Sequence, residues 1–290
     1  MNSIIFALIF SMAIPILVMV LLTRSLEDSA PRQANYRGRL VYNGLGIVWF
    51  VWLLSFWIGA HLFVMAGIEQ PLWVTYIIPI FPLIAGTVIF GLLDDWVGDS
   101  NAKGFRGHLR AMLHLTITTG GLKMLGIGFL SFFTAVSLYW DGIYALPRVL
   151  LVTCAIALMA NFMNLFDLRP GRAGKAYVVI LLLAILSLSL SAVVQMKPED
   201  VAAIALTGIG PLLAVWRYDL GEKGMLGDCG ANSMGAFLGF IFATSLPMWA
   251  LAILVLLLLA LNILSERFSF SRIIDACRPL SWLDNLWRKR

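Results

Sequence analysis

The chain has 290 residues, of which 60% are hydrophobic and only 13% are charged, and its mean hydropathy is +0.89. Because soluble domains are about 25% charged, this composition excludes an ordinary soluble protein and indicates a polytopic membrane protein. The formal net charge of +5 taken alone is compatible with nucleic-acid binding. The three cysteines are scattered and odd in number, so they predict neither a disulfide framework nor a zinc site.

Apolar windows long enough to cross a bilayer, about 20 residues each, predict about nine membrane helices, with ten as the upper count. The predicted spans are 3–23, 44–66, 72–93, 109–126, 147–165, 176–195, 201–216, 232–246 and 247–265. The stretch 127–146 is also apolar, but glycines and Asp141 interrupt it, which predicts a short external hairpin or a re-entrant segment.

The first span has neither a basic start nor a small-residue cleavage site, so we expect it to remain as a helix. The predicted fold is therefore an all-α membrane helical bundle. It consists of one integral domain, 1–265, and a short basic, aromatic tail, 266–290.

The basic residues predict the orientation of this bundle. With the N-terminus outside, alternate loops and the C-terminal tail hold all 21 Lys and Arg residues except Lys123, Arg148 and Lys197. The positive-inside rule expects this asymmetry, so the tail and these loops are predicted to be cytoplasmic. The basic excess thus sets topology and attracts anionic lipid, and nucleic-acid binding is not expected.

Three short polar clusters interrupt the apolar chain, and all three fall on the predicted cytoplasmic side. The first, Asp94-Asp95, directly follows the third predicted span. Two adjacent carboxylates can bind a metal or act as a general base, although a solvated start of a loop is the structural alternative. Lys103 follows beside two glycines, where a lysine and accessible backbone N–H groups suit phosphate; an ordinary basic loop is again the alternative.

The second cluster has the pattern Asn161-x-x-Asn164-x-x-Asp167, which places these side chains along one face of a helix end. Arg169 and Arg172 flank a Pro-Gly turn just beyond it. Each arginine can form a two-pronged hydrogen bond to a phosphate or a carboxylate. Hydrogen bonding between helices is the structural alternative for the two asparagines.

The third cluster contains Asp228 in a Gly-Asp-Cys-Gly turn, followed by Asn232 or Ser233 as the predicted N-cap of the next span. A helix start offers free N–H groups to anions, and Asp228 could supply a ligand to Mg²⁺. Gly235 and Gly239 form a small-xxx-small pattern that predicts close helix packing.

The ordered set Asp94-Asp95, Lys103-Gly104-Phe105, Asn161-x-x-Asn164-x-x-Asp167 and Gly227-Asp228-x-Gly230 resembles the polyprenyl-phosphate N-acetylhexosamine-1-phosphate transferases. This family includes phospho-N-acetylmuramoyl-pentapeptide transferase and the UDP-GlcNAc:undecaprenyl-phosphate GlcNAc-1-phosphate transferase. The resemblance covers roughly residues 30 to 240, and the segment from Pro31 to Gly46 is loosely similar to the family's opening loop.

The resemblance implies a Mg²⁺-dependent enzyme, with Mn²⁺ as a substitute, in the plasma membrane with its active site facing the cytoplasm. It would transfer a sugar-1-phosphate from a UDP-sugar to undecaprenyl or another polyprenyl phosphate, release UMP and so initiate a cell-envelope polysaccharide or peptidoglycan precursor. It leaves a homodimer open as an assembly.

The family also implies roles for individual residues. Asp228, with Asn164 as a second ligand, would hold the metal; Asp94 or Asp95 would hold or activate the acceptor; and Lys103 would contact phosphate. Substrate binding would fall to the second cluster, with Asp167, Arg169 and Arg172 facing the nucleotide or sugar and with Asn161 and Asn164 beside them.

Two departures from the family pattern keep an alternative open. The second cluster continues as Leu168-Arg169-Pro170-Gly171-Arg172, where the family usually has Asp-Gly-hydrophobic-Asp-Gly, and the family's histidine-rich late loop is missing. The alternative is a non-catalytic relative that binds polyprenyl phosphate or scaffolds envelope synthesis. A transporter, which would need ionisable residues at mid-membrane depth, is a third interpretation.

Overall fold

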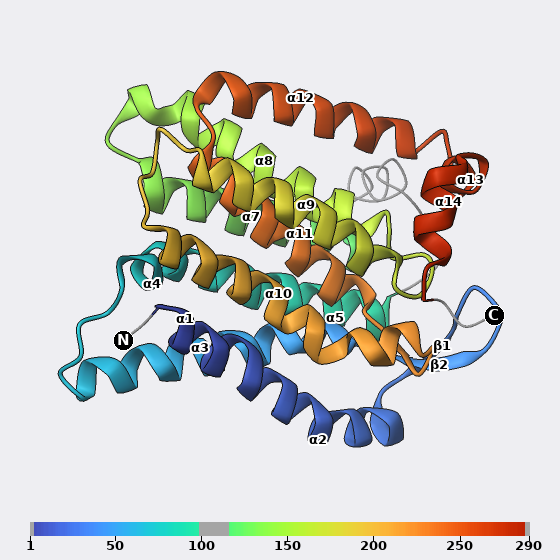
Figure 1. The fold of residues 1–290 in the computed structure, drawn as a ribbon. Helices are drawn as coiled ribbons and strands as arrows, with labels where there is room; N and C mark the ends of the chain where they lie inside the picture. Colours follow the sequence, from blue (N-terminus) through green and yellow to red (C-terminus); the bar gives the residue numbers. More distant parts are fainter. Residues whose placement is uncertain (1–2, 99–115, 288–290) are drawn as a thin grey trace.

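The computed structural model describes residues 3–98 and 116–287. Long helices run back and forth along one direction, with α1 starting at one end of the bundle and α13 and α14 lying at the other (Figure 1). The elements are α1 Ser3–Phe6, the π-helical turn η1 Ala7–Ala13, α2 Ile14–Ser29, β1 Arg32–Ala34, β2 Leu40–Asn43, η2 Leu45–Ile47, α3 Val48–Met65, α4 Leu72–Ile77, η3 Ile78–Ile80, α5 Phe81–Val97, α7 Thr119–Tyr139, η4 Ile143–Ala145, α8 Leu146–Asn164, α9 Arg172–Ser189, α10 Pro198–Leu220, β3 Gly224–Met225, α11 Gly227–Ser245, α12 Met248–Ser265, α13 Phe270–Ala276 and α14 Arg278–Asn285.

Within the described residues, eight helices are long and apolar enough to cross a membrane. This confirms the prediction of an all-α membrane protein with many spans. One further long helix, α11, begins with the polar third cluster and is not among the eight. It lies inside the bundle beside the other helices (Figure 1).

The fourth predicted span is wrong. Residues 109–126 were expected to cross the membrane. Of these, 109–115 lie outside the described residues and 116–118 are not helical, and the helix that follows is α7, Thr119–Tyr139. Most of the stretch 127–146, which was expected to form a short external hairpin or a re-entrant segment, therefore belongs to α7, a helix long and apolar enough to cross a membrane. Gly128 does not break it, because a helix tolerates an isolated glycine at a cost of about 1 kcal/mol, and Asp141 and Gly142 lie beyond its end.

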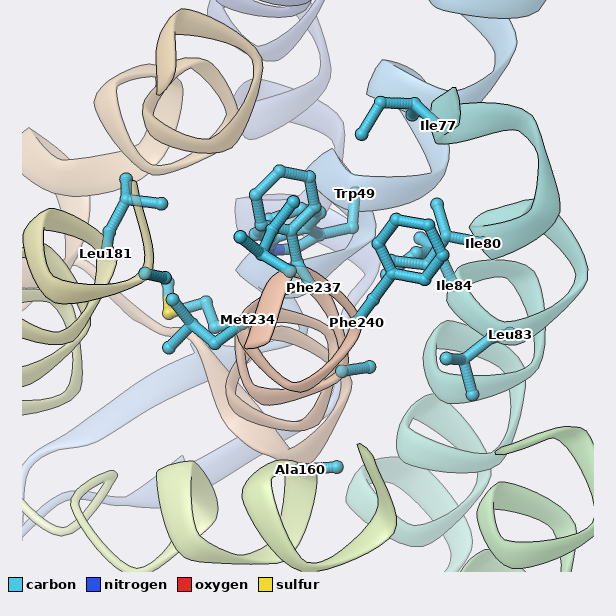
Figure 2. Packing of buried hydrophobic residues seen from close by; sticks show 14 of the residues in the cluster. Trp49, Ile77, Ile80, Leu83, Ile84, Ala160, Leu181, Met234, Phe237 and Phe240 are labelled. Carbon is cyan, nitrogen blue, oxygen red and sulfur yellow. The ribbon is translucent and has the colours of Figure 1, made fainter. Parts of the chain in front are cut away.

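The core is organised around α11, in which every residue from Cys229 to Ser245 is buried. Helices α5, α8 and α9 pack around it. Figure 2 shows Phe237 and Phe240 projecting from α11 among aliphatic side chains of neighbouring helices and the ring of Trp49. A side chain added at Gly235 or Gly239 would meet the α8 backbone, which confirms the predicted close packing at these glycines.

The start of α11 also makes a close backbone crossing with α5. A Cβ atom added at Gly91 would lie 2.3 Å from the Cα of Cys229, far inside van der Waals contact. We therefore expect Gly91→Ala to destabilise the protein by about 1–3 kcal/mol, since neither backbone can yield without moving a whole helix. Thermal unfolding in detergent measures this loss.

The matched control for Gly91→Ala is Gly128→Ala in α7. A Cβ atom at Gly128 meets nothing within 4 Å, so this change removes a helix-interior glycine without a clash. It should leave stability unchanged or raise it slightly. Equal destabilisation by the two substitutions would contradict the close crossing of α5 and α11.

A small three-stranded sheet lies at the end of the bundle where α13 and α14 are found (Figure 1). Strands β1 and β2 are antiparallel, and β2 pairs in parallel with β3, with Tyr42 opposite Gly224 and Asn43 opposite Met225. The sequence predicted only a loop between Pro31 and Gly46. The sheet fastens this loop to the segment that leads into α11, and so helps to fix the start of that helix.

Candidate functional site

Asp95, near the end of α5, connects this helix to strand β2 and to the start of α11. Its carboxylate accepts hydrogen bonds from the backbone N–H of Asp228 (2.9 Å) and of Cys229 (3.2 Å), and from the side-chain amide of Asn43 (3.1 Å). The Asp95 residue is only 8% exposed. A carboxylate at the first turn of α11 satisfies N–H groups that lack intrahelical partners and interacts favourably with the helix dipole. Asp95 therefore fixes the start of α11.

The predicted N-cap of this helix is wrong. Asn232 or Ser233 was expected to cap it, but α11 begins at Gly227, and both residues lie inside the helix. There the Asn232 amide donates to the carbonyl of Asp228, and the Ser233 hydroxyl donates to the carbonyl of Cys229. Asp95, distant in sequence, takes the capping role instead.

Asp94, the neighbour of Asp95, faces a different set of partners. The Lys123 ammonium donates to Asp94 Oδ2 at 2.6 Å and is also hydrogen-bonded to Asp228 Oδ2, while the Thr119 hydroxyl donates to Asp94 Oδ1 at 2.7 Å. These side chains are partly shielded, since Lys123, Asp94 and Asp228 are 14%, 18% and 24% exposed. One ammonium between two carboxylates leaves a formal charge of −1 on this group.

The position of Lys123 corrects the topology prediction. Lys123 was expected on the opposite side of the membrane from Asp94 and Asp228, yet it contacts both. The reason is the misplaced fourth span: Lys123 belongs to the second turn of α7, one turn beyond Thr119 on the same helix face. The four-residue spacing of these two donors was the sequence signal that could have revealed it.

Asp167 lies in the turn between α8 and α9 and comes close to the same group. Burial raises the pKa of Asp167 well above its usual range, and the negative charges of Asp219, Asp95 and Asp228 raise it further; a hydrogen bond from the Gly227 backbone N–H opposes this. Asp219 in turn accepts a hydrogen bond from the N–H of Gly171 at 2.9 Å. Asp167 thus lies near Asp228, at the end of the bundle where Asp94 and Asp228 share Lys123.

The two asparagines of the second cluster have different surroundings. The Asn161 amide donates to the side chain of Asn262 at 2.5 Å, and Asn262 also bonds to the Leu158 carbonyl. This is the hydrogen bonding between helices that was the structural alternative, here between α8 and α12. Asn164 is the last residue of α8, and its carbonyl accepts from the N–H of Asp167.

The two arginines of the second cluster form the two-pronged hydrogen bonds that the sequence suggested, and their partners are carboxylates of the same chain. Arg169 binds both oxygens of Asp275 at 2.9 and 2.8 Å, and Arg172 binds both oxygens of Asp284 at 2.9 and 2.8 Å. Asp275 lies in α13 and Asp284 in α14. The segment expected as a short tail therefore folds back onto the bundle as two helices.

The donor chemistry at Asp94 and Asp228 fits a divalent cation in one respect. Two carboxylates from different helices converge on one positive charge, and Mg²⁺ uses one or two carboxylates with water and phosphate as its other ligands. Across residues 3–98 and 116–287, no group of three or more His, Cys, Asp or Glu side chains could hold a metal ion. Lys103, the predicted phosphate contact, lies outside the described residues.

In comparisons with known proteins, no family model matches the chain, and no curated protein matches it either.

Proposed function

We propose that this protein is a membrane phosphotransferase that moves a sugar-1-phosphate from a UDP-sugar to a polyprenyl phosphate. The observation that supports this most is the acidic junction, the place where Asp94 and Asp228, from separate helices, both bind Lys123. Ionisable groups are costly near a bilayer and are usually retained for function. Their position at one end of the bundle suits a lipid acceptor whose phosphate lies at the membrane surface.

The reaction exchanges one phosphoanhydride bond for another. An oxygen of the acceptor phosphate bonds to the phosphorus that carries the sugar, and the bond from that phosphorus to the bridging oxygen breaks, so that UMP leaves with this oxygen. No ATP is consumed. Catalysis then consists of positioning two phosphates against each other and neutralising their charge.

The residues of the junction fit these tasks. Asp228 and Asp94 would hold Mg²⁺, which when bound supplies charge neutralisation to the phosphates. Lys123 would then exchange one carboxylate for a phosphate oxygen, since an ammonium has three donors. Asp95 would keep the start of α11, and with it Asp228, in position. Asn164 and Lys103 stay part of the proposal as a second metal ligand and a phosphate contact.

We place this centre on the cytoplasmic side of the plasma membrane, in a bundle of nine spans with the N-terminus outside. The charge asymmetry supports this orientation and becomes stronger with Lys123 at the site end, because only Arg148 and Lys197 then remain on the other side. A downstream envelope polysaccharide or peptidoglycan precursor would be the product's destination.

The test is a donor panel. Purified protein with Mg²⁺ and undecaprenyl phosphate should release UMP from one member of a set of UDP-sugars and form the lipid-linked sugar diphosphate. Omission of the lipid acceptor is the control and should abolish UMP release. If no UDP-sugar in the panel gave UMP release while a reference transferase was active in the same assay, this proposal would be wrong.

A second candidate is a non-catalytic relative that binds polyprenyl phosphate. It is favoured by the carboxylates of the same chain that occupy Arg169 and Arg172. This candidate predicts lipid-phosphate binding without UMP release from any donor, and binding that survives Asp228→Ala.

A further inference from the structure

Three basic side chains around the start of α9, here called the cation cluster, hold the C-terminal hairpin α13–α14. They are Arg169, Arg172 and Lys175. Besides the paired hydrogen bonds from the arginines to Asp275 and Asp284, Lys175 donates to the backbone carbonyl of Asp284 at 2.6 Å, and Arg172 donates to the Ser271 hydroxyl at 2.7 Å. In Figure 1 the hairpin lies across this end of the bundle.

The innermost pair of this contact is almost completely removed from water. The side chains of Arg172 and Asp284 are 4% and 3% exposed. A guanidinium buried to this extent is strongly unfavourable without an anionic partner. As long as it stays buried, the Arg172 guanidinium therefore needs an anionic partner, and in this structure that partner belongs to the protein's own tail.

The cation cluster is also directly connected to the acidic junction. Asp167, two residues before Arg169, lies close enough to Asp228 for the negative charge of Asp228 to raise the pKa of Asp167. The N–H of Gly171, between the two arginines, is bound by Asp219. A ligand on the cation cluster would thus lie beside the proposed reaction centre.

We propose that the cation cluster is a binding site for a diphosphate, and that Asp275 and Asp284 occupy it as an internal substitute. A guanidinium binds carboxylates and phosphates through the same paired donors, so one ligand can replace the other. The identity of the diphosphate, that of the UDP-sugar, rests on the proposed function. Docking of the hairpin and binding of the nucleotide then exclude each other, and the tail acts as a built-in competitor.

Competition from the docked tail weakens the apparent affinity of the protein for the nucleotide. A tethered competitor acts at an effective concentration of about millimolar for a short linker. Neutralising both tail carboxylates, as Asp275→Asn with Asp284→Asn in the full chain, should tighten UDP binding about tenfold or more. Asp275→Asn alone should give a smaller gain; because Asp275 is 45% exposed, this variant also guards against misfolding of the double variant.

Cys277, which lies between α13 and α14 and is exposed, offers a direct reporter of the hairpin. Cys229 is buried, so a Cys154→Ser protein can be spin-labelled at Cys277 alone. We expect an immobilised label in the free protein, a mobile label after saturation with UDP, and a mobile label without UDP in the double variant. Asp141→Asn, at the opposite end of the bundle, is the matched control and should leave label mobility and UDP affinity unchanged.

Two results would overturn the inference: a label that stays immobile at saturating UDP, or an unchanged UDP affinity in both tail variants. Release by phosphatidylglycerol nanodiscs but not by UDP would contradict the nucleotide assignment and make the cluster a lipid-headgroup site. The transfer assay is independent of these readouts. If the protein transfers sugar-1-phosphate but the label on the tail stays immobile with UDP, only this inference is wrong. If UDP mobilises the label but no donor supports transfer, only the proposed function is wrong.

Discussion

Replacing Asp228 with alanine is expected to reduce sugar-phosphate transfer by about 100-fold or more, the scale on which single groups that stabilise transition-state charge act. Asp228 contributes one of the two carboxylates that meet at Lys123, and without it the centre loses its capacity to hold a divalent cation between α5 and α11. UMP release at saturating donor and acceptor measures the change in kcat. Mn²⁺ binding, followed by electron paramagnetic resonance, should weaken in parallel.

Asp141→Asn is the matched control for Asp228→Ala, since it removes one carboxylate at the other end of the bundle and should leave transfer unchanged. The two variants should unfold at similar temperatures, because the backbone of Asp228 keeps its hydrogen bond to Asp95. Retained turnover in Asp228→Ala would exclude this carboxylate from the reaction and would leave the proposed metal centre without support.

Replacing Asp95 with alanine is expected to destabilise the protein by about 3–5 kcal/mol. The substitution leaves two buried N–H groups at the start of α11 without their acceptor, at about 1–3 kcal/mol for each unsatisfied group, and it removes one of the two acceptors of the Asn43 amide. The loss of a helix cap is part of the same effect. Thermal unfolding in detergent, monitored by helix content, measures it.

Asp94→Asn separates the roles of the two adjacent aspartates. Asp94 contacts Lys123 and Thr119 at a partly exposed position, so its amide variant should remain close to wild type in stability and lose transfer activity. Asp95→Asn, which keeps an acceptor oxygen, should fall between wild type and Asp95→Ala in stability. If Asp94→Asn and Asp95→Ala lowered stability equally, the assignment of Asp95 as the cap of α11 would be wrong.

Much of the fold could be predicted because the local amino-acid composition of a segment is enough to identify a membrane span. Apolar length alone marked eight of the nine predicted spans close to the observed helices. The exception was 109–126. Hydropathy cannot distinguish this window from the overlapping apolar window 119–139, because glycines in the region leave no sharp boundary between apolar and polar residues. That single shift of α7 moved Lys123 to the wrong side of the membrane.

The candidate site was only partly predictable. Asp94, Asp167 and Asp228 stood out because carboxylates beside apolar runs are rare. The different roles of Asp94 and Asp95 could not be predicted, because two adjacent aspartates are equivalent in sequence. Only the folded structure shows that the start of α11 contacts Asp95. Asn43, Asp219 and the tail aspartates were missed for the same reason: each acts through a partner distant in the chain.

The sequence by itself determined that this chain forms a helical bundle in a membrane and that its acidic clusters lie at one end of the bundle. These properties follow from hydrophobic free energy and charge, which each segment carries independently of its neighbours. Only the tertiary structure decided which carboxylate caps a helix, which meets a lysine, and that two arginines bind the protein's own tail. Ion pairs and hydrogen bonds act over a few ångströms, and packing alone brings such partners together.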